Sequence, residues 1–146
     1  MKKALICALL GLLLLTGCAK KAVDPAVLGP ALLEGAGFPE GMLTLESDMA
    51  GSIFRMDMTA VTACYAAVSG SAGADELLVL TAEDEDAAEA VYDLLSDRIS
   101  YRRESFADYS PAEAAKLQEA ILLREGTAVV CCVCPDPEAA LKIIGW

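Results

Sequence analysis

Cysteine thiols are the side chains of this chain best suited to chemistry, because they can ligate metals, form disulfides or act as nucleophiles. Cys131, Cys132 and Cys134 lie together in one apolar segment, and Cys64 lies far upstream. Since neighbouring residues of a strand point to opposite faces, Cys132 and Cys134 share one face and Cys131 points to the other. The spacing lacks the paired C-x2-C pattern of zinc sites. The pattern favours buried thiols that pack as small hydrophobes, with a disulfide from Cys64 or a metal site as alternatives.

Other catalytic chemistry has little support in the sequence. There is no histidine, which excludes Ser-His-Asp and Cys-His catalysis and imidazole-ligated metals. The 22 Asp and Glu residues could pair for acid–base chemistry, as in glycoside hydrolysis, but the sequence does not say which carboxylates meet. We therefore predict no catalytic residue, cofactor or metal ligand. A small extracytoplasmic enzyme that uses paired carboxylates is the alternative.

Three charged or glycine-rich motifs have ordinary structural interpretations. The acidic run Glu83–Asp86 lacks the residue spacing of a calcium-binding loop, and it suits the start of a helix. The segment 70–75 contains two glycines but no Gly-Lys-Ser/Thr follows it, so it predicts a hairpin loop rather than a phosphate-binding loop. Arg98, Arg102 and Arg103 could bind an anion, but they also suit the end of a helix.

The N-terminal segment has the organisation of an export signal. Lys2 and Lys3 precede the apolar run Ala4–Leu15, which is too short to cross a bilayer, since that needs about 20 residues. The run ends in Leu-Thr-Gly-Cys at residues 15–18. This sequence resembles the lipobox of bacterial lipoproteins. The resemblance implies removal of the signal peptide and attachment of palmitate-type acyl chains to Cys18.

This interpretation divides the chain into three parts. Residues 1–17 form the signal peptide, residues 18–24 the acylated cysteine and a short tether, and residues 25–146 a single domain. Loss of Lys2 and Lys3 takes the net charge from -11 to -13. So acidic a domain does not suit nucleic-acid phosphates. We expect a lipid-anchored protein on the extracytoplasmic face of the cell membrane, with membrane lipid as its partner through Cys18.

Past the tether, the sequence predicts an α+β fold. Apolar runs bounded by turn residues predict four antiparallel strands, at residues 61–69, 76–81, 120–123 and 127–134. The links at 70–75 and 124–126 join them into two hairpins, and residues 38–45 read as a loop. Capping residues and helical periodicity predict the long helix 83–107 and the shorter helices 25–34, 47–54, 110–117 and 137–144. After the first helices, the order is therefore ββαββα, with the N-terminal helices packed on the sheet.

Two details of these helices can be checked against a structure. Gly29-Pro30 is expected to kink the first helix or delay its start, because proline lacks the backbone donor. Ser47 is expected to cap the second helix.

The strands are unusually apolar on both faces. Residues 128–134 and 77–80 carry no polar side chain other than thiols, whereas half-exposed antiparallel strands alternate. Helices on both faces, a second copy of the chain or a partner protein would each explain this pattern.

Several stretches resemble the DUF4358 domain-containing bacterial lipoproteins. They are the segment Ser69–Leu77 before a strand, Ser105–Pro111 after the long helix, and Lys116-Leu117 before the second hairpin, in a chain that also has a lipobox. The function of that family is unassigned, so the resemblance implies no activity or site residue. We expect a non-enzymatic binding or accessory module, which associates with a protein partner or with itself through the sheet. A single-domain small-molecule binder is a further alternative.

Overall fold

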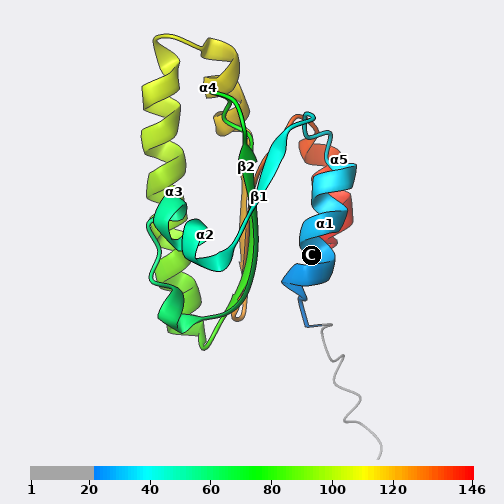
Figure 1. Cartoon of the computed structure of the whole chain (residues 1–146), viewed down its shortest axis with the longest axis vertical. Helices are drawn as coiled ribbons and strands as arrows, with labels where there is room; N and C mark the ends of the chain where they lie inside the picture. Colours follow the sequence, from blue (N-terminus) through cyan, green and yellow to red (C-terminus); the bar gives the residue numbers. More distant parts are fainter. Residues whose placement is uncertain (1–21) are drawn as a thin grey trace, which may run out of the picture.

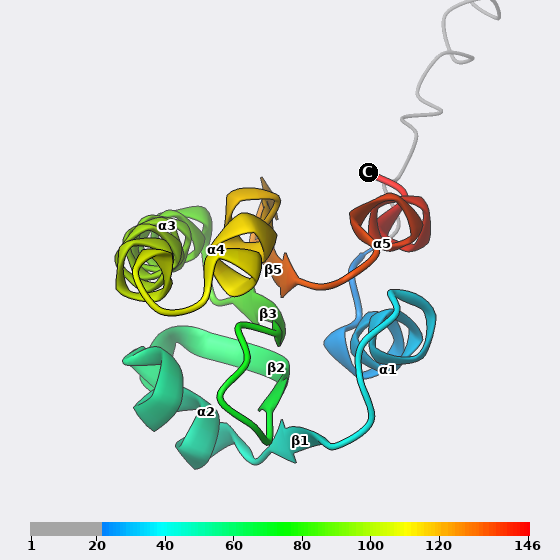
Figure 2. The same cartoon turned by 90° about the horizontal axis from the view of Figure 1, so that it is seen from above.

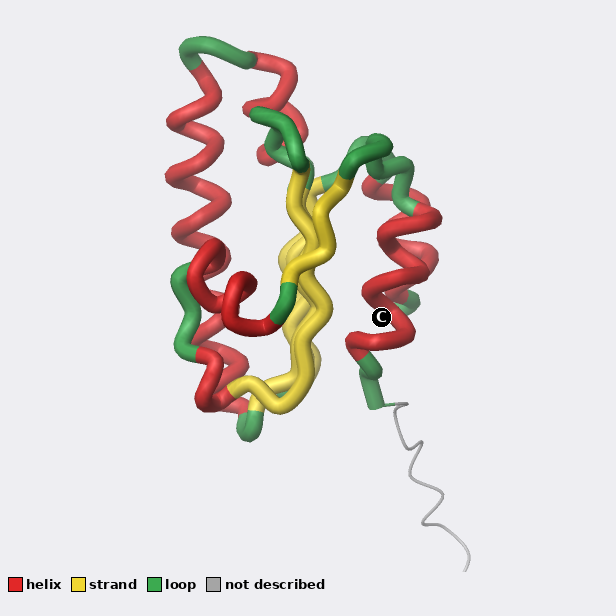
Figure 3. The backbone as a smooth tube through the Cα atoms, in the orientation of Figure 1, coloured by secondary structure: helices red, strands yellow, loops and turns green. Residues whose placement is uncertain are grey.

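The computed structural model describes residues 22–146 as three layers, in which helices cover both faces of a five-stranded antiparallel sheet (Figures 1 and 3). The predicted signal peptide and Cys18 lie outside these residues. The strands are β1 (Met42–Leu45), β2 (Val61–Ser69), β3 (Glu76–Ala82), β4 (Ile121–Glu125) and β5 (Ala128–Val133). The helices are α1 (Pro25–Gly35), α2 (Ser47–Phe54), α3 (Glu85–Ala107), α4 (Pro111–Gln118) and α5 (Pro137–Ile144), with a 3-10 turn η1 (Met58–Ala60).

The α+β class and the two hairpins are confirmed, but the number of strands is five rather than four. The strand order is β1-β2-β3-β5-β4, and every neighbouring pair is antiparallel. The added strand, β1, lies in the segment 38–45 that the sequence indicated as a loop. Its four residues pair with the end of β2, from Met42 opposite Ser69 to Leu45 opposite Ala66. So short a strand forms because β2 offers it a free edge, which no local pattern reveals.

Helices on both faces account for the apolar strands (Figure 2). Leu77, Val79, Val130 and Cys132 belong to a core with residues of α1 and α5. Their neighbours in sequence point the other way, into a core with residues of α2 and α3. The first of the three explanations is therefore correct.

The predicted helices are present, and most begin where the sequence indicated. Asp24, Asp84 and Asp136 each cap a helix by accepting a hydrogen bond from a backbone N–H of its first turn. The Ser47 cap is wrong: α2 begins at Ser47, and Glu46 precedes it without a side-chain cap. No helix in residues 22–146 is long and apolar enough to cross a membrane.

Helix α1 starts at Pro25 and continues through Pro30, so its start is not delayed. Tertiary packing stabilises it, because Leu32 is fully buried and Gly29 lies directly against the ring of Tyr65 on β2.

The contact at Gly29 gives a test of this packing. A Cβ at residue 29 would overlap the Tyr65 ring and lie 2.7 Å from Tyr65 Cβ. We expect Gly29→Ala to lower the free energy of unfolding, measured by urea denaturation, by about 1–3 kcal/mol, because overpacking strains a filled core.

Gly35→Ala, in the same helix, is the matched control. Its Cβ would meet only the flexible end of Ile143 closely, so we expect no loss of stability and a gain of up to about 1 kcal/mol from helix propensity. Equal effects of the two substitutions would contradict the proposed packing of α1 on β2.

Candidate functional site

Six charged side chains meet where the 70–75 loop enters β3, and we call this group the charge cluster. Among the described residues, Asp75 and Glu76 are the charged side chains that the fold buries, with exposures of 4% and 1%. Their partners come from two helices far along the chain. The six members of the charge cluster are Asp75, Glu76, Arg98, Arg102, Glu113 and Lys116.

Glu76 lies between two arginines of α3. Its Oε2 atom is 2.9 Å from Arg98 Nη2 and 2.6 Å from Arg102 Nη1. Arg98 Nε also donates to both carboxylate oxygens, at 3.3 Å and 3.2 Å. The two arginines reach one carboxylate because residues i and i+4 share a face of a helix. Burial of this charge is possible only because cations and hydrogen bonds replace the lost water.

The same arginines connect α3 to other elements. Arg98 Nη1 donates to the Ile53 carbonyl at 3.0 Å, and its guanidinium lies over the Phe54 ring, 4.8 Å from the centroid. Arg102 Nη1 donates to the Ala74 carbonyl at 3.2 Å, and its guanidinium stacks on Phe106. The end of α2, the middle of α3 and the 70–75 loop are thereby held together.

Asp75 is paired from α4. Lys116 Nζ lies 2.8 Å from Asp75 Oδ2 and 3.1 Å from Glu113 Oε2. Glu113 Oε2 also accepts the Ala74 N–H at 2.6 Å. This backbone hydrogen bond, helped by Lys116, lowers the pKa of Glu113. For Lys116, burial opposes the charged form, but the hydrogen bonds to Asp75 and Glu113 outweigh it and raise its pKa.

The charge cluster is electrically balanced, with three carboxylates and three cationic groups. Within residues 22–146, one buried polar atom of the cluster, Asp75 Oδ1, has no hydrogen-bond partner. Because the other charges engage one another, the arrangement acts as a clamp that holds α3 and α4 on the sheet.

Two of the six members of the charge cluster, Arg98 and Arg102, are predicted from the sequence as an anion site or a helix end. The anion that they bind is an internal carboxylate. Arg103 is exposed. Asp75 and Glu76 were missed as a site. The sequence did contain a signal: Glu76 stands directly before the apolar run Leu77–Leu80, in the same chain as a helix with Arg98 and Arg102 four residues apart.

The cysteines do not converge. Cys131 packs in the core of the α2 and α3 face, and Cys132 and Cys134 pack on the α1 and α5 face, which confirms the predicted alternation. Cys64 is half-buried, and all four are free thiols. Burial raises the pKa of Cys64 to about 11 and also raises that of Cys131. Residues 22–146 contain no group of three or more His, Cys, Asp or Glu side chains placed to hold a metal ion.

Two grooves lie away from the charge cluster. The larger, about 680 Å³, runs between the two ends of the described chain, along α1 and α5. The smaller, about 380 Å³, lies between α3 and β4, and it is lined in part by Glu89, Asp93 and Arg124.

The fold and the cluster define a class: a three-layer antiparallel α+β domain with a balanced internal charge cluster. Residues 38–134 match the family described as a domain of unknown function, DUF4358. The chain belongs to this family. The matched range contains the whole charge cluster, and α1 and α5 lie outside it. No curated protein and no solved structure matches the chain.

The clamp can be tested with Glu76→Gln, which keeps the shape of the side chain and removes its charge. Removing one partner of a fully buried ion pair costs about 3–5 kcal/mol. Both arginines keep roughly a fifth of their side-chain surface exposed (20% and 19%). We therefore expect the free energy of unfolding to fall by about 2–4 kcal/mol in urea denaturation.

Glu104→Gln, an exposed position on the same helix, is the control and should change stability by less than about 0.5 kcal/mol. A Glu76→Gln protein as stable as the Glu104→Gln protein would show that the charge cluster is not a clamp.

The lowered pKa of Glu113 predicts a pH dependence with a definite sign. Its ionised form stabilises the fold above the unfolded-state pKa, about 4.3 for glutamate, and this contribution is lost as pH falls through the lower folded-state pKa. We expect Glu113→Gln to be less stable than the wild type at pH 7. The difference should shrink below about pH 4, as measured by urea denaturation at each pH. A difference independent of pH would rule out this linkage.

Proposed function

We propose that this protein is a membrane-anchored extracytoplasmic lipoprotein whose domain serves as a non-enzymatic binding or accessory module. The observation that carries the proposal is the Leu-Thr-Gly-Cys motif at residues 15–18, which stands only six residues before Asp24, the cap of the first helix. Six residues extend at most about 20 Å. A lipid on Cys18 would therefore hold the folded domain close to the bilayer.

The state of the ionisable groups supports a non-enzymatic role. The buried carboxylates of Asp75 and Glu76 are matched by cations of the charge cluster. The thiols of Cys131 and Cys132 are buried. Burial raises the pKa of Cys131, and a hydrogen bond with Cys134 together with burial raises the pKa of Cys132, so both favour the unreactive protonated form. The same hydrogen bond lowers the pKa of Cys134. A module that binds through its surface needs none of these groups to be free.

A small enzyme that uses paired carboxylates is the runner-up. Glu89 and Asp93 lie one turn apart on α3 and both line the smaller groove. Acid–base catalysis by two carboxylates requires environments that differentiate the pair. Both of these side chains are exposed, which makes this the weaker proposal. A small-molecule binder is also compatible with the larger groove, whose volume is in the usual range for ligand sites.

A protein partner or a second copy could still engage the sheet, but the route is restricted. Both faces carry helices, so such a contact would use the outer edge of β1 or β4, the two edge strands. Strand addition at an exposed edge is a common mode of recognition.

The anchor is tested by Cys18→Ala in the native organism. We expect this variant to incorporate no labelled fatty acid and to leave the membrane fraction, because the acylated residue is absent. The measurement is metabolic labelling together with fractionation of the wild type and the variant. An acylated, membrane-bound Cys18→Ala protein would refute the lipoprotein proposal.

The accessory role is tested in the same pair of strains by mild in-cell crosslinking, detergent extraction and mass spectrometry. A stoichiometric partner that is crosslinked to the wild type and lost with Cys18→Ala would support the module. A wild-type protein recovered alone as a monomer would favour the small-molecule binder or the enzyme.

A further inference from the structure

The larger groove has an apolar lining and lies where the two ends of the described chain meet. We use the name α1–α5 face for six of its apolar residues: Val23, Val27, Leu28, Ala31, Ile143 and Trp146. Val27 is 67% exposed and Trp146 is 42% exposed, although both are large and apolar. The acids Asp24 and Glu125 also line the groove, and the Asp24 carboxylate is engaged in capping α1.

Helix α1 lacks the polar outer surface that a helix on the outside of a protein normally has. From Pro25 to Leu33 it carries no charged or hydrogen-bonding side chain, and Glu34 is its first charge. The exposed positions of this stretch are Ala26, Val27 and Ala31, and Glu34 and Gly35 at the end of the helix are also exposed. This outer surface is therefore suited to an apolar neighbour rather than to water.

The opposite side of the molecule has the reverse character. Helix α3 covers the other face of the sheet (Figures 1 and 2). Its exposed residues include six acids and one base: Glu85, Asp86, Glu89, Asp93, Asp97 and Glu104, with Arg103. The α3 side is therefore strongly acidic, whereas the exposed charges of α1 and α5 are Glu34, Glu138 and Lys142, none of which lines the groove.

The short distance along the chain from Cys18 to the α1–α5 face indicates what this face contacts. Ala22 and Val23 belong to the groove itself, and Ala22 is the fourth residue after Cys18. Four extended residues span at most about 14 Å. If Cys18 is acylated, this face cannot move far from the headgroup region. Tryptophan is also the side chain most typical of that region.

We propose that the α1–α5 face rests on the lipid bilayer, with Val27 and Trp146 in the boundary between headgroups and acyl chains, and with the acidic side of α3 turned away. This inference rests on the proposed lipid anchor. The acyl chains of Cys18 hold the protein at the membrane, and the α1–α5 face sets its orientation there. Repulsion between the acidic α3 and anionic lipids favours the same orientation.

The chain supplies its own probe, because Trp146 is its one tryptophan. We would reconstitute the full-length acylated protein in phosphatidylcholine vesicles whose acyl chains carry bromine, a contact quencher of indole fluorescence. Relative to unbrominated vesicles, we expect Trp146 emission to fall at least about twofold, because the ring lies at the depth of the interface.

Val27→Glu is the variant that tests the face without disturbing the fold. Val27 is the third residue of α1, where a glutamate complements the helix dipole and can accept a hydrogen bond from the backbone N–H of the capping residue Asp24. Thermal unfolding should therefore show no loss of stability. A charge at this exposed position should nevertheless lift the face from the bilayer and remove most of the quenching.

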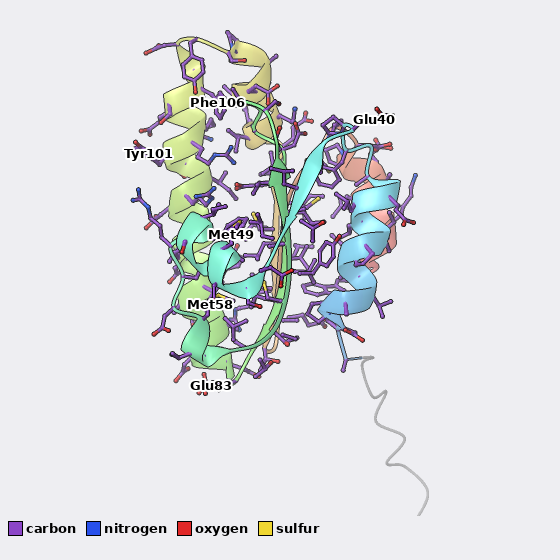
Figure 4. All side chains as sticks on the ribbon, in the orientation of Figure 1. Glu40, Met49, Met58, Glu83, Tyr101 and Phe106 are labelled. Carbon is purple, nitrogen blue, oxygen red and sulfur yellow. The ribbon has the colours of Figure 1, made fainter. Side chains whose placement is uncertain are left out.

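The control places the probe on the opposite side of the molecule, as Trp146→Phe/Tyr101→Trp. Tyr101 is 72% exposed and points outward from α3 (Figure 4). We expect its tryptophan emission to be the same in brominated and unbrominated vesicles.

The possible outcomes separate the inference from the proposal on which it rests. The α1–α5 face is supported as the docking surface if three results are obtained together. Trp146 is strongly quenched in the wild type, it is only weakly quenched in Val27→Glu, and the tryptophan at residue 101 is not quenched. If the acylated protein floats with the vesicles but Trp146 is not quenched, is quenched equally with residue 101, or is quenched equally in Val27→Glu, the inference is wrong and the anchor stands. If the protein carries no lipid and does not float with the vesicles, both the lipid anchor and the docking surface are wrong.

Discussion

The fold depends on one electrostatic constraint, the buried carboxylate of Glu76 at the start of the central strand β3. A carboxylate that is 1% exposed must be neutralised in place, and Arg98 and Arg102 can do this only if α3 lies across the sheet at one position along its axis. Arg98 then reaches the end of α2, and Arg102 reaches the loop before β3. One buried charge therefore fixes the positions of α2, α3 and the 70–75 loop on the sheet. Apolar contacts alone would allow these helices to shift along it. Lys116 extends the same constraint to α4 through Asp75.

Sequence patterns predicted the helices and strands that are determined by neighbouring residues. The bounds of β2 and β3 followed from apolar runs with a glycine-rich link, and the starts of α1 and α5 followed from an aspartate directly before a proline. Strand β1 could not be predicted in this way, because its four residues become a strand only beside the free edge of β2. The persistence of α1 through Pro30 likewise comes from its packing on Tyr65, which lies on a strand that forms later in the chain.

In the candidate site, too, features determined by neighbouring residues were predictable and those determined by distant residues were not. Strand alternation alone placed Cys131 and Cys132 on opposite faces, and the structure agrees. The burial of Asp75 and Glu76 was not predictable from their neighbours, because a charged residue at a loop–strand junction is usually solvated. Its stabilisation comes from residues more than twenty positions away in sequence. The match to the DUF4358 family spans this cluster, and it leaves outside the two helices that carry the apolar surface.

The pairing of β3 with β5 has a consequence for how the molecule forms. These two strands pair residues 76–81 with residues 128–133. The sheet is therefore formed from two hairpins that come from different halves of the sequence. Neither half can bury both faces of its inner strand alone, because the β3–β5 pairing and the helices that cover the sheet involve both halves of the sequence. Folding must therefore close a long loop before most of the apolar surface is removed from water, which slows the search and makes the transition cooperative. During synthesis, the sheet therefore cannot be completed until residues 128–133 have left the ribosome.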